Sequence, residues 1–584
     1  MKWIYFIILI LSSCSQFEKN LYTDDLSYDL TFNIRGVRSS AERYAISQSS
    51  SNNSFYYMGN VGEGIDAAIN IEEHSNTRTE KIASNIENLD RTTLENGIKY
   101  RIILCKTNGN CYAINGTSGG ETKFLGADPG VTYKWYAYSY NTANSLDNLN
   151  VEADTINIRN SQNIYNLEGN NVEVNPKNDF LYASGEITTD PDKTVSNNIA
   201  VLFERKTANL EIILDARGMF GEILEVKNTL LNKNFKKGTF NIKNGSYVSN
   251  SFLSTSFGII NNDYKQYDSS FKDMVKKANI YIVNTNENID GLKITLKDLK
   301  ISGDRRILDG YINNWGDPHV FSNVDINVPN LSPQHGKRYK VKVTLIMTGK
   351  TIGDVTWARG NLYRKSSEEE SSSIAYRMRV HAGSNVYGTV ENSKGIKSSG
   401  EYFSMSANIP VNDPCKKVYP QGYWRLPTLS DFNGLKQISP SKVTFSGNEF
   451  PNPFILNGTS NSYVKEIRLF KFFLNGSEGP TDPPYDTQEN RLTFMLFGYV
   501  KNGSDSEASW NLTDYSTGES AKGYYWTSDK PSNNKTYAYV LSQDGTVNNR
   551  PKSKMEAVEL NDSNKANIKC VRNLSWDGTS ARDL

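Results

Sequence analysis

The sequence contains few apolar residues for its length. Hydrophobic residues make up 37% of the 584 positions, below the roughly 45–50% of a typical soluble domain. Asn, Ser and Thr take much of their place; Asn favours turns, while Thr and the 34 Tyr favour strands. A mostly helical protein is therefore not expected. At roughly 100–200 residues per domain, this length predicts about three to five β-rich domains.

The sequence also lacks an excess of charge of either sign. It has 65 Lys and Arg against 64 Asp and Glu, which gives a formal net charge of +1. Proteins that bind nucleic acid normally carry a basic surplus, because they must neutralise phosphates. Nucleic acid is therefore not an expected partner.

Metal ligands and catalytic groupings are sparse as well. The four His are isolated and no Cys-x-x-Cys pair occurs, so a zinc site is not expected. Segment 116–120 has the Gly-x-Ser-x-Gly pattern of hydrolases, but a poor helix former follows it. Segment 349–351 (GKT) lacks the first Gly of a phosphate loop. We expect neither an enzyme nor a cofactor or metal.

The N-terminus indicates export. Lys2 precedes an apolar run at 3–11 that is too short to span a bilayer and is followed by small residues. No later stretch approaches the roughly 18 consecutive apolar residues of a membrane span.

Residues 11–14 (LSSC) resemble the bacterial lipobox, the short motif that ends a lipoprotein signal peptide and finishes on the Cys. The resemblance implies that residues 1–13 are a signal peptide, that Cys14 carries the acyl chains, palmitate included, and that residues 14–24 are a tether. Ser15 after the Cys favours the outer membrane. The alternative is an ordinary secretory signal that is cut just before an incidental Cys14.

Four cysteines remain when Cys14 is set aside, an even number in an oxidising compartment. Three pairings are possible. Pairing within the nearest domain favours Cys105 with Cys111 and Cys415 with Cys570. In the chain-entropy model the short loop is worth about 2 kcal/mol and the long one about 5 kcal/mol.

Short runs rich in β-branched residues, bounded by Asn and Gly turns, recur through the first 350 residues. Segment 339–347 (YKVKVTLIM) alternates apolar with polar residues, Lys340 and Lys342 among the latter, which predicts a strand with one buried face. This pattern is typical of antiparallel sandwiches. We expect two such domains, at residues 25–192 and 193–350.

The third region, 351–584, differs from the first two in amino-acid composition and in sequence pattern. Trp, Gly and Pro become frequent, and Thr428 and Asp431 have the spacing of a capping box at the start of a helix. A mixed α/β domain is therefore expected here. Earlier in the chain, the Ser- and Asn-rich segments 39–60 and 141–176 are expected to be long surface loops.

Several segments resemble the fimbrillin-like (Mfa-like) surface lipoproteins of Bacteroidetes, whose two transthyretin-like β-sandwich domains form fimbrial subunits. Besides the lipobox, they are 133–142 (YKWYAYSYNT), 180–187 (FLYASGEI) and 205–214 (RKTANLEIIL). Segment 357–362 (WARGNL) resembles the W-A-x-G-N-L motif that follows those domains in members with a C-terminal extension.

The extension resembles the major paralogous domain first named from Fibrobacter, which has a C-type-lectin-like fold. The matching segments are 413–428, 523–528 and 569–572. Trp424 and Trp526 are candidate ligand contacts through sugar stacking, with core packing as the alternative. Arg425 is expected to pair with a carboxylate of its own domain or to cap a sheet edge. Calcium-lectin signatures are absent, so metal-dependent sugar binding is not expected.

The resemblance implies a lipoprotein on the surface of the outer membrane that joins a fimbrium by strand exchange. In the family an Arg-directed protease removes an N-terminal strand, and a neighbouring subunit fills the groove. Arg35 and Arg38 are the candidate cutting positions, with plain surface arginines as the alternative.

A C-terminal extension would hinder polymerisation at that end, so we expect an accessory or tip-like subunit with a role in cell adhesion. The expected partners are other fimbrial subunits, the outer membrane through the lipid anchor, and a glycan or protein on host or bacterial surfaces. The alternative function is a glycan-binding surface lipoprotein that does not polymerise.

Overall fold

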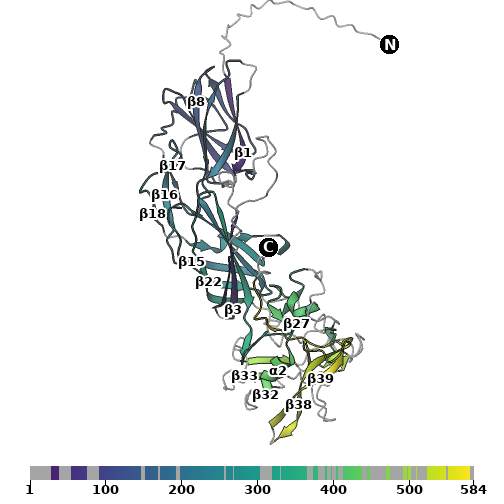
Figure 1. The fold of residues 1–584 in the computed structure, drawn as a ribbon. Helices are drawn as coiled ribbons and strands as arrows, with labels where there is room; N and C mark the ends of the chain where they lie inside the picture. The colour runs from purple at the N-terminus through teal and green to yellow at the C-terminus, as the bar shows by residue number, and fades with distance from the viewer. Residues whose placement is uncertain are drawn as a thin grey trace, which may run out of the picture.

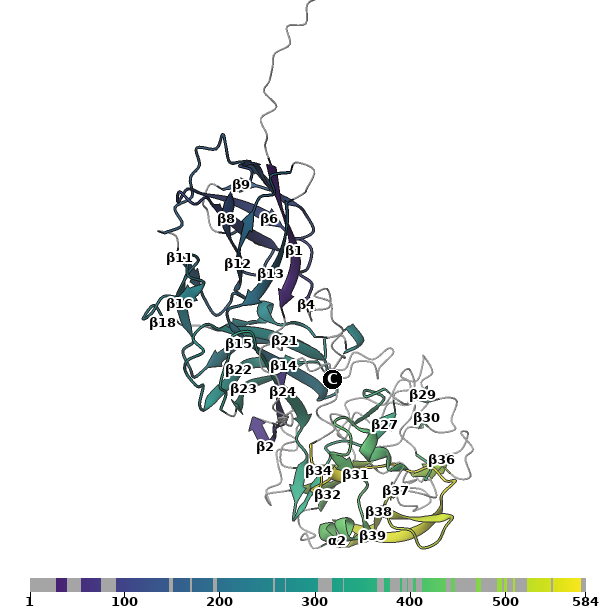
Figure 2. The same ribbon diagram turned by 45° about the horizontal axis from the view of Figure 1, so that its top comes forward.

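The structure is a computed structural model, and its ribbon is shown in Figure 1. It is mainly β, with two sandwiches followed by a third region (Figures 1 and 2). Among the described residues, none of the helices combines the length and apolar character needed to cross a bilayer. The described residues are 28–38, 54–62, 64–74, 91–146, 151–168, 171–192, 197–255, 258–267, 269–271, 273–302, 318–328, 330–364, 372–378, 389–390, 396–397, 403–405, 412–436, 443–446, 469–473, 491–495, 498–500, 508–509, 522–547 and 550–578.

The first sandwich is built from one ten-stranded sheet, in the order β10-β7-β1-β13-β12-β8-β5-β6-β9 with β4 beside β1. Its strands are β1 (Tyr28–Arg38), β4 (Arg91–Thr92), β5 (Lys99–Cys105), β6 (Cys111–Thr117), β7 (Thr122–Ala127), β8 (Thr132–Ser139), β9 (Glu152–Ala153), β10 (Thr155–Asn157), β12 (Leu181–Thr188) and β13 (Asn197–Arg205). Apolar side chains from β1, β5, β8 and β13 share one core, so the sheet folds over on itself.

The second sandwich packs a six-stranded sheet on a four-stranded one. The larger sheet contains β2 (Ser54–Gly62), β3 (Ile65–His74), β14 (Ala208–Gly218), β20 (Lys265–Gln266), β21 (Val275–Ile282) and β24 (Arg338–Met347). The smaller contains β15 (Ile223–Leu231), β19 (Ile259–Ile260), β22 (Leu292–Ile301) and β23 (His319–Val328). All eleven residues of β14 are buried, as expected of a central strand covered on both faces.

Strand pairing crosses the domain boundary expected at residue 192. β13 completes the first sandwich, where it pairs with β1 and β12. In the other direction, β3 pairs along the whole of β24, from Ile65 opposite Met347 to His74 opposite Arg338. Local periodicity indicates a strand but carries no information on which sheet the strand joins, so the sequence could not assign β2 and β3.

The two segments expected to be long loops also contain strands. β2 overlaps 39–60, and 141–176 contains β9, β10 and β11 (Asn171–Val174). β11 pairs with β16 (Lys236–Asn241), which also contacts β17 (Ser246–Tyr247) and β18 (Leu253–Ser254). This small sheet lies beside the junction of the two sandwiches (Figure 1) and packs its apolar side chains against the first one.

The third region contains several small sheets and the helix α2 (Leu429–Lys436). Its strands are β25 (Lys350–Ile352), β26 (Val355–Trp357), β27 (Leu362–Arg364), β28 (Tyr376–Met378), β29 (Thr389–Val390), β30 (Ile396–Lys397), β31 (Trp424–Arg425), β32 (Val443–Ser446), β33 (Leu469–Phe473), β34 (Arg491–Met495), β35 (Tyr499–Val500), β36 (Ala508–Ser509), β37 (Lys522–Trp526), β38 (Lys535–Val547), β39 (Arg550–Asn561) and β40 (Val571–Arg572). Among the described residues, 3-10 turns lie at Asn261–Asp263 and Ser269–Phe271, before the third region, and at Pro414–Lys417 within it.

Two disulfides are formed within the described part of the chain. Cys105 and Cys111 lie directly opposite each other in the β5–β6 hairpin. Cys415 and Cys570 join positions 155 residues apart in the third region. These are the pairs that the nearest-domain argument favours.

Candidate functional sites

The first candidate site is the position of β1 inside the first sandwich. β1 pairs in parallel with β13, from Leu30 opposite Asn197 to Val37 opposite Phe203. On its other side it pairs antiparallel with β7 and then with β4. β1 therefore lies between two neighbours, and its removal would leave a slot with two unpaired strand edges.

The inner face of β1 completes the apolar core. Leu30 and Phe32 are fully buried, and the Phe32 ring makes edge contacts with Phe124 and Trp135 at centroid distances of 5.6 and 5.8 Å. Full burial of a side chain of this size is worth about 1.5–3 kcal/mol. An empty slot would expose to water the core side chains that pack against Leu30 and Phe32. Binding of another apolar strand in the slot would therefore be favourable.

Arg35 and Arg38 both lie within β1, in different surroundings. Arg35 is exposed and lies where the register with β13 shifts between Ile34 and Gly36, so it occupies a bulge. Gly36 has φ +125°, and a Cβ there would lie 2.4 Å from the Thr92 carbonyl oxygen. Arg38 is half-buried, and its Nη1 donates to Glu204 Oε1 over 3.2 Å.

The two candidate ligand-contact tryptophans lie in the core of the third region. Trp424 is 2% exposed and Trp526 is 0% exposed. The Trp526 indole nitrogen donates to the Phe403 carbonyl oxygen. A buried indole offers no face on which a sugar can stack, so this packing supports the core role and not the ligand contact. Cys14, the candidate lipidation site, lies outside the described residues.

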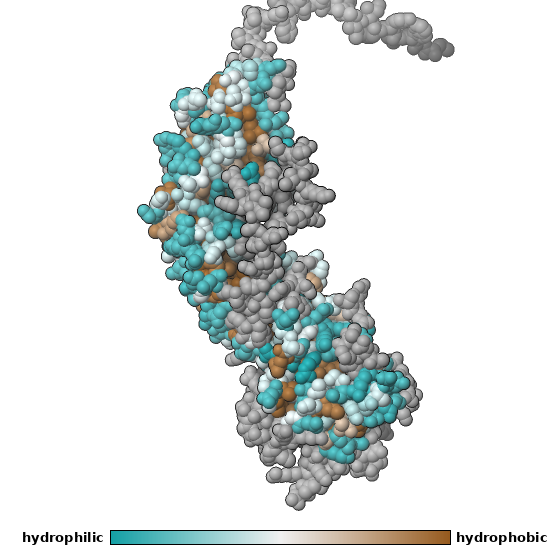
Figure 3. Space-filling view, in the orientation of Figure 1, coloured by the Kyte–Doolittle hydropathy of each residue, from teal (hydrophilic) through white to brown (hydrophobic). Residues whose placement is uncertain are grey.

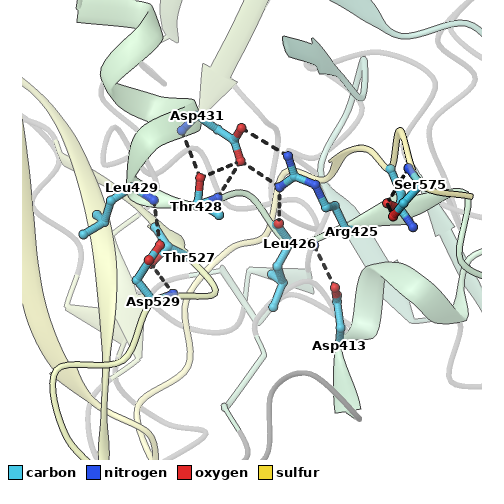
Figure 4. A network of polar contacts seen from close by, with 10 residues as sticks. Asp413, Arg425, Leu426, Thr428, Leu429, Asp431, Thr527, Asp529 and Ser575 are labelled. Carbon is cyan, nitrogen blue, oxygen red and sulfur yellow. Dashed lines mark hydrogen bonds and ion pairs between the residues drawn. The ribbon is translucent and has the colours of Figure 1, made fainter. Parts of the chain in front are cut away.

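Arg425 pairs with a carboxylate of its own region, Asp431, as shown in Figure 4. Its Nη1 donates to Asp431 Oδ2 over 2.7 Å and its Nη2 to Oδ1 over 3.2 Å. Burial alone would raise the pKa of Asp431, but hydrogen bonds from Arg425 and Thr428, together with the charge of Arg425, outweigh it and lower that pKa.

The same carboxylate caps α2. Asp431 Oδ2 accepts from the Thr428 backbone N–H over 2.7 Å, and Thr428 Oγ1 accepts from the Asp431 N–H over 3.1 Å (Figure 4). This reciprocal pair is the capping box that the sequence predicts, and the prediction is confirmed. The network fixes β31 against α2, so its role is structural.

A buried ionic cluster joins the third region to the second sandwich. On β14, Arg217 binds Asp215 through two hydrogen bonds of 3.0 and 2.8 Å. Tyr419 of the third region donates its hydroxyl to Asp215 over 2.6 Å, and its ring lies 3.9 Å from the Arg217 guanidinium carbon. Lys342 of β24 adds a second cation 3.7 Å from Asp215.

This cluster corrects the expectation that β24 buries only one face. Lys342 is 4% exposed because the third region covers the polar face of the strand. Burial alone would raise the pKa of Asp215, but Arg217 and Lys342 outweigh it and lower that pKa. Burial beside the same carboxylate raises the pKa of Tyr419 well above its usual value. The cluster is therefore a fixed ion pair with a hydroxyl donor.

A second contact of the same kind lies nearby. The Asp66 carboxylate, on β3, accepts from the Tyr423 hydroxyl and from Thr348 Oγ1, both over 2.9 Å. Arg572 lies 3.9 Å from it. Burial raises the pKa of Asp66. The third region therefore contacts two separate strands of the same sheet through buried polar groups.

Sequence reasoning missed both contacts. The available signal is a charged residue inside an otherwise apolar strand: Asp215 and Arg217 follow the run LEIIL, and Asp66 precedes AAINI. Buried charges need partners, so such interruptions mark surfaces that another part of the chain covers. Among the described residues, no three His, Cys, Asp or Glu side chains gather as a possible metal site.

In comparisons with known proteins, the chain shows similarity to solved structures. No family model matches the chain, and no curated protein sequence matches it.

Three similar structures come from two genera. A candidate cell adhesion protein of Bacteroides fragilis is 11% identical, with a TM-score of 0.30 over 55% of this chain and 94% of that one. Another, from Bacteroides eggerthii, is 12% identical, with a TM-score of 0.25 over 55% and 86%. The fimbrial anchor protein Mfa2 of Porphyromonas gingivalis is 8% identical, with a TM-score of 0.17 over 37% and 74%.

Proposed function

We propose that this chain is an accessory or tip-like fimbrial subunit with a role in cell adhesion, carried to the surface of the outer membrane as a lipoprotein acylated at Cys14. It is not an enzyme. It assembles with other fimbrial subunits by strand exchange, after an Arg-directed protease has cut within β1. The third region, 351–584, is a lectin-like domain at the adhesive end.

The position of β1 carries this proposal. An N-terminal strand that lies between two neighbours can be replaced by a strand from another subunit without any change in the order of the remaining strands. The incoming strand would regain the two ladders of backbone hydrogen bonds and the burial of Leu30 and Phe32.

The chain after the cut stays attached to the molecule. The next described elements, β2 and β3, are held in the second sandwich, where β3 pairs with β24 over ten residues. Loss of residues before Gly36 therefore removes most of β1 and leaves the second sandwich complete.

Arg35 is the preferred cutting position. Its side chain is exposed, it lies in a bulge outside the regular ladder, and a Gly follows it. Arg38 is a poorer substrate because Glu204 holds its guanidinium.

The test compares the chain in sheared surface filaments with the chain in total membranes. The filament form should begin at Gly36, and the variant Arg35→Ala/Arg38→Ala should stay in the membrane fraction. Asp29→Ala is the matched control, because it changes an exposed residue of the same strand and keeps both arginines. Recovery of only acylated Cys14 at the surface, or normal assembly of the double variant, would overturn the proposal.

A further inference from the structure

A pocket of about 690 Å³ lies beside the junction of the two sandwiches, away from the β1 slot. One wall is the segment that carries β16, β17 and β18, and the other is the turn after β21. In Figure 3 the flank around β18 is mostly hydrophilic, with a small apolar area. Val248 and Leu253 are exposed large apolar residues of this segment.

Aromatic rings form the apolar part of the pocket. The Tyr247 ring contacts Phe252 at a centroid distance of 5.5 Å and His335 at 5.7 Å. The Tyr247 hydroxyl donates to the Lys206 carbonyl oxygen over 2.9 Å, which fixes the ring in place. Phe252 is half-buried and so keeps part of its ring accessible from the pocket.

Amide and hydroxyl groups form the polar part. Asn250 and Asn286 line the pocket together with Ser249 and Thr285. Within the described part of the chain, no hydrogen bond involves the side chains of these two asparagines. Each amide offers two N–H donors and a carbonyl acceptor. This suits a ligand with hydroxyl groups, because each hydroxyl can both donate and accept a hydrogen bond.

His335 adds a neutral acceptor. Its Nε2 lies 3.2 Å from the Val283 carbonyl oxygen, and since a carbonyl can only accept, Nε2 carries the proton. Although His335 is exposed at the surface, partial desolvation of its ring lowers its pKa, in the direction of the neutral form. Nδ1 is then the acceptor of the ring.

The charges at the pocket cancel. Lys236 and Glu287 form an ion pair with each other, so neither is left to attract a charged ligand. The same two residues and Asn284 also line a second pocket of about 270 Å³. The two pockets are therefore adjacent, with the ion pair between them, and together they suit a ligand longer than one ring.

We infer that this double pocket is a binding site for a neutral saccharide of two or more sugar units. Phe252 and Tyr247 supply the apolar surface for sugar C–H groups, and Asn250, Asn286 and His335 bind hydroxyls. A few convergent polar groups beside aromatic rings are the usual composition of a small-molecule site.

This inference adds a ligand class to the adhesive role proposed above, and its biological meaning rests on that role. Saccharide binding itself depends on neither processing nor filament assembly. If the strand-exchange proposal fails, saccharide binding at the pocket can still be observed. If the pocket binds no saccharide, strand exchange can still occur.

The experiment measures binding of the purified full chain to immobilised neutral oligosaccharides of hexoses and N-acetylhexosamines, with sulfated forms of the same sugars beside them. The affinity for the best soluble member is then measured by calorimetry. We expect saturable binding to neutral members. Phe252→Leu and Asn286→Ala should each weaken it by about tenfold, which corresponds to about 1.4 kcal/mol.

Asn327→Ala is the matched control, since it removes an exposed amide from β23, which contributes no residue to either pocket. Thermal melting checks that each variant is folded. Absence of saturable binding to every neutral member would overturn the inference. So would a preference for the sulfated forms, or an affinity within twofold of the parent in both pocket variants.

Discussion

The Tyr423 hydroxyl donates a hydrogen bond to the Asp66 carboxylate across 357 positions of sequence. One partner lies in the third region and the other in a strand formed near the start of the chain. With the cluster around Asp215, this contact fixes the third region on the second sandwich.

Replacement of Tyr423 by Phe should destabilise the protein. The change removes a donor and leaves a buried carboxylate with fewer partners, which typically costs about 1–3 kcal/mol. Chemical denaturation, followed by intrinsic fluorescence, measures the loss. Tyr537→Phe is the control, because Tyr537 is half-buried and its hydroxyl makes no hydrogen bond within the described residues. Equal stability of the two variants would show that the contact is not formed.

Limited digestion with an Arg-specific protease should cut the purified chain first after Arg35. Its side chain is exposed in a bulge, whereas Glu204 holds Arg38. Mass spectrometry of early products identifies the cut. Glu204→Gln should raise the rate of cutting after Arg38 and leave the rate at Arg35 unchanged. A first cut after Arg38 in the parent protein would contradict the role given to the bulge.

Lys569 should make stability depend on pH near neutrality. Its side chain is fully buried; the ammonium donates to the Arg359 carbonyl oxygen over 3.0 Å and lies 5.1 Å from the centre of the Phe494 ring. Burial lowers the pKa of Lys569 to about 7, against about 10.4 in an unfolded chain. Between these values the unfolded state binds more protons, so stability rises with pH.

Lys569→Met should therefore stabilise the protein at pH 6, where the lysine of the parent is charged in its buried site. The increase in the free energy of unfolding should be smaller at pH 9. The substitution should remove a slope of the free energy of unfolding against pH that approaches about 1.4 kcal/mol per pH unit. Urea titrations at several pH values measure it. The exposed Lys554→Met is the control. A difference between Lys569→Met and the parent that is constant with pH would refute the prediction.

Loss of the Cys415–Cys570 disulfide should cost more than loss of Cys105–Cys111. The first closes a loop of 155 residues and the second a loop of 6. In the chain-entropy model the long loop is worth about 5 kcal/mol and the short one about 2 kcal/mol. Paired Cys→Ser variants, compared by denaturant unfolding, test this order. The reverse order would show that native-state effects dominate.

Features set by neighbouring residues were predictable from the sequence. The alternating runs around Lys340 and the Thr428–Asp431 spacing predict β24 and the start of α2, because strand periodicity and capping act over a few residues. The two disulfide pairs follow from the assignment of cysteines to domains.

Features set by distant contacts were not predictable. The burial of Lys342 depends on Tyr419, which covers it from another domain, and no local pattern distinguishes a covered lysine from a solvated one. The same holds for β3, whose partner β24 is remote, and for Trp424 and Trp526, whose burial depends on the packing of the whole third region.

The place of β3 also sets an order of folding. Asp66 and its partner Thr348 are 282 positions apart, so the larger sheet of the second sandwich cannot close until β24 has been synthesised and is free to pair. Contacts between such distant positions slow folding. A fragment covering 193–350 would lack β2 and β3 and would present one edge of β24 unpaired, so the second sandwich is not a separable module of the chain.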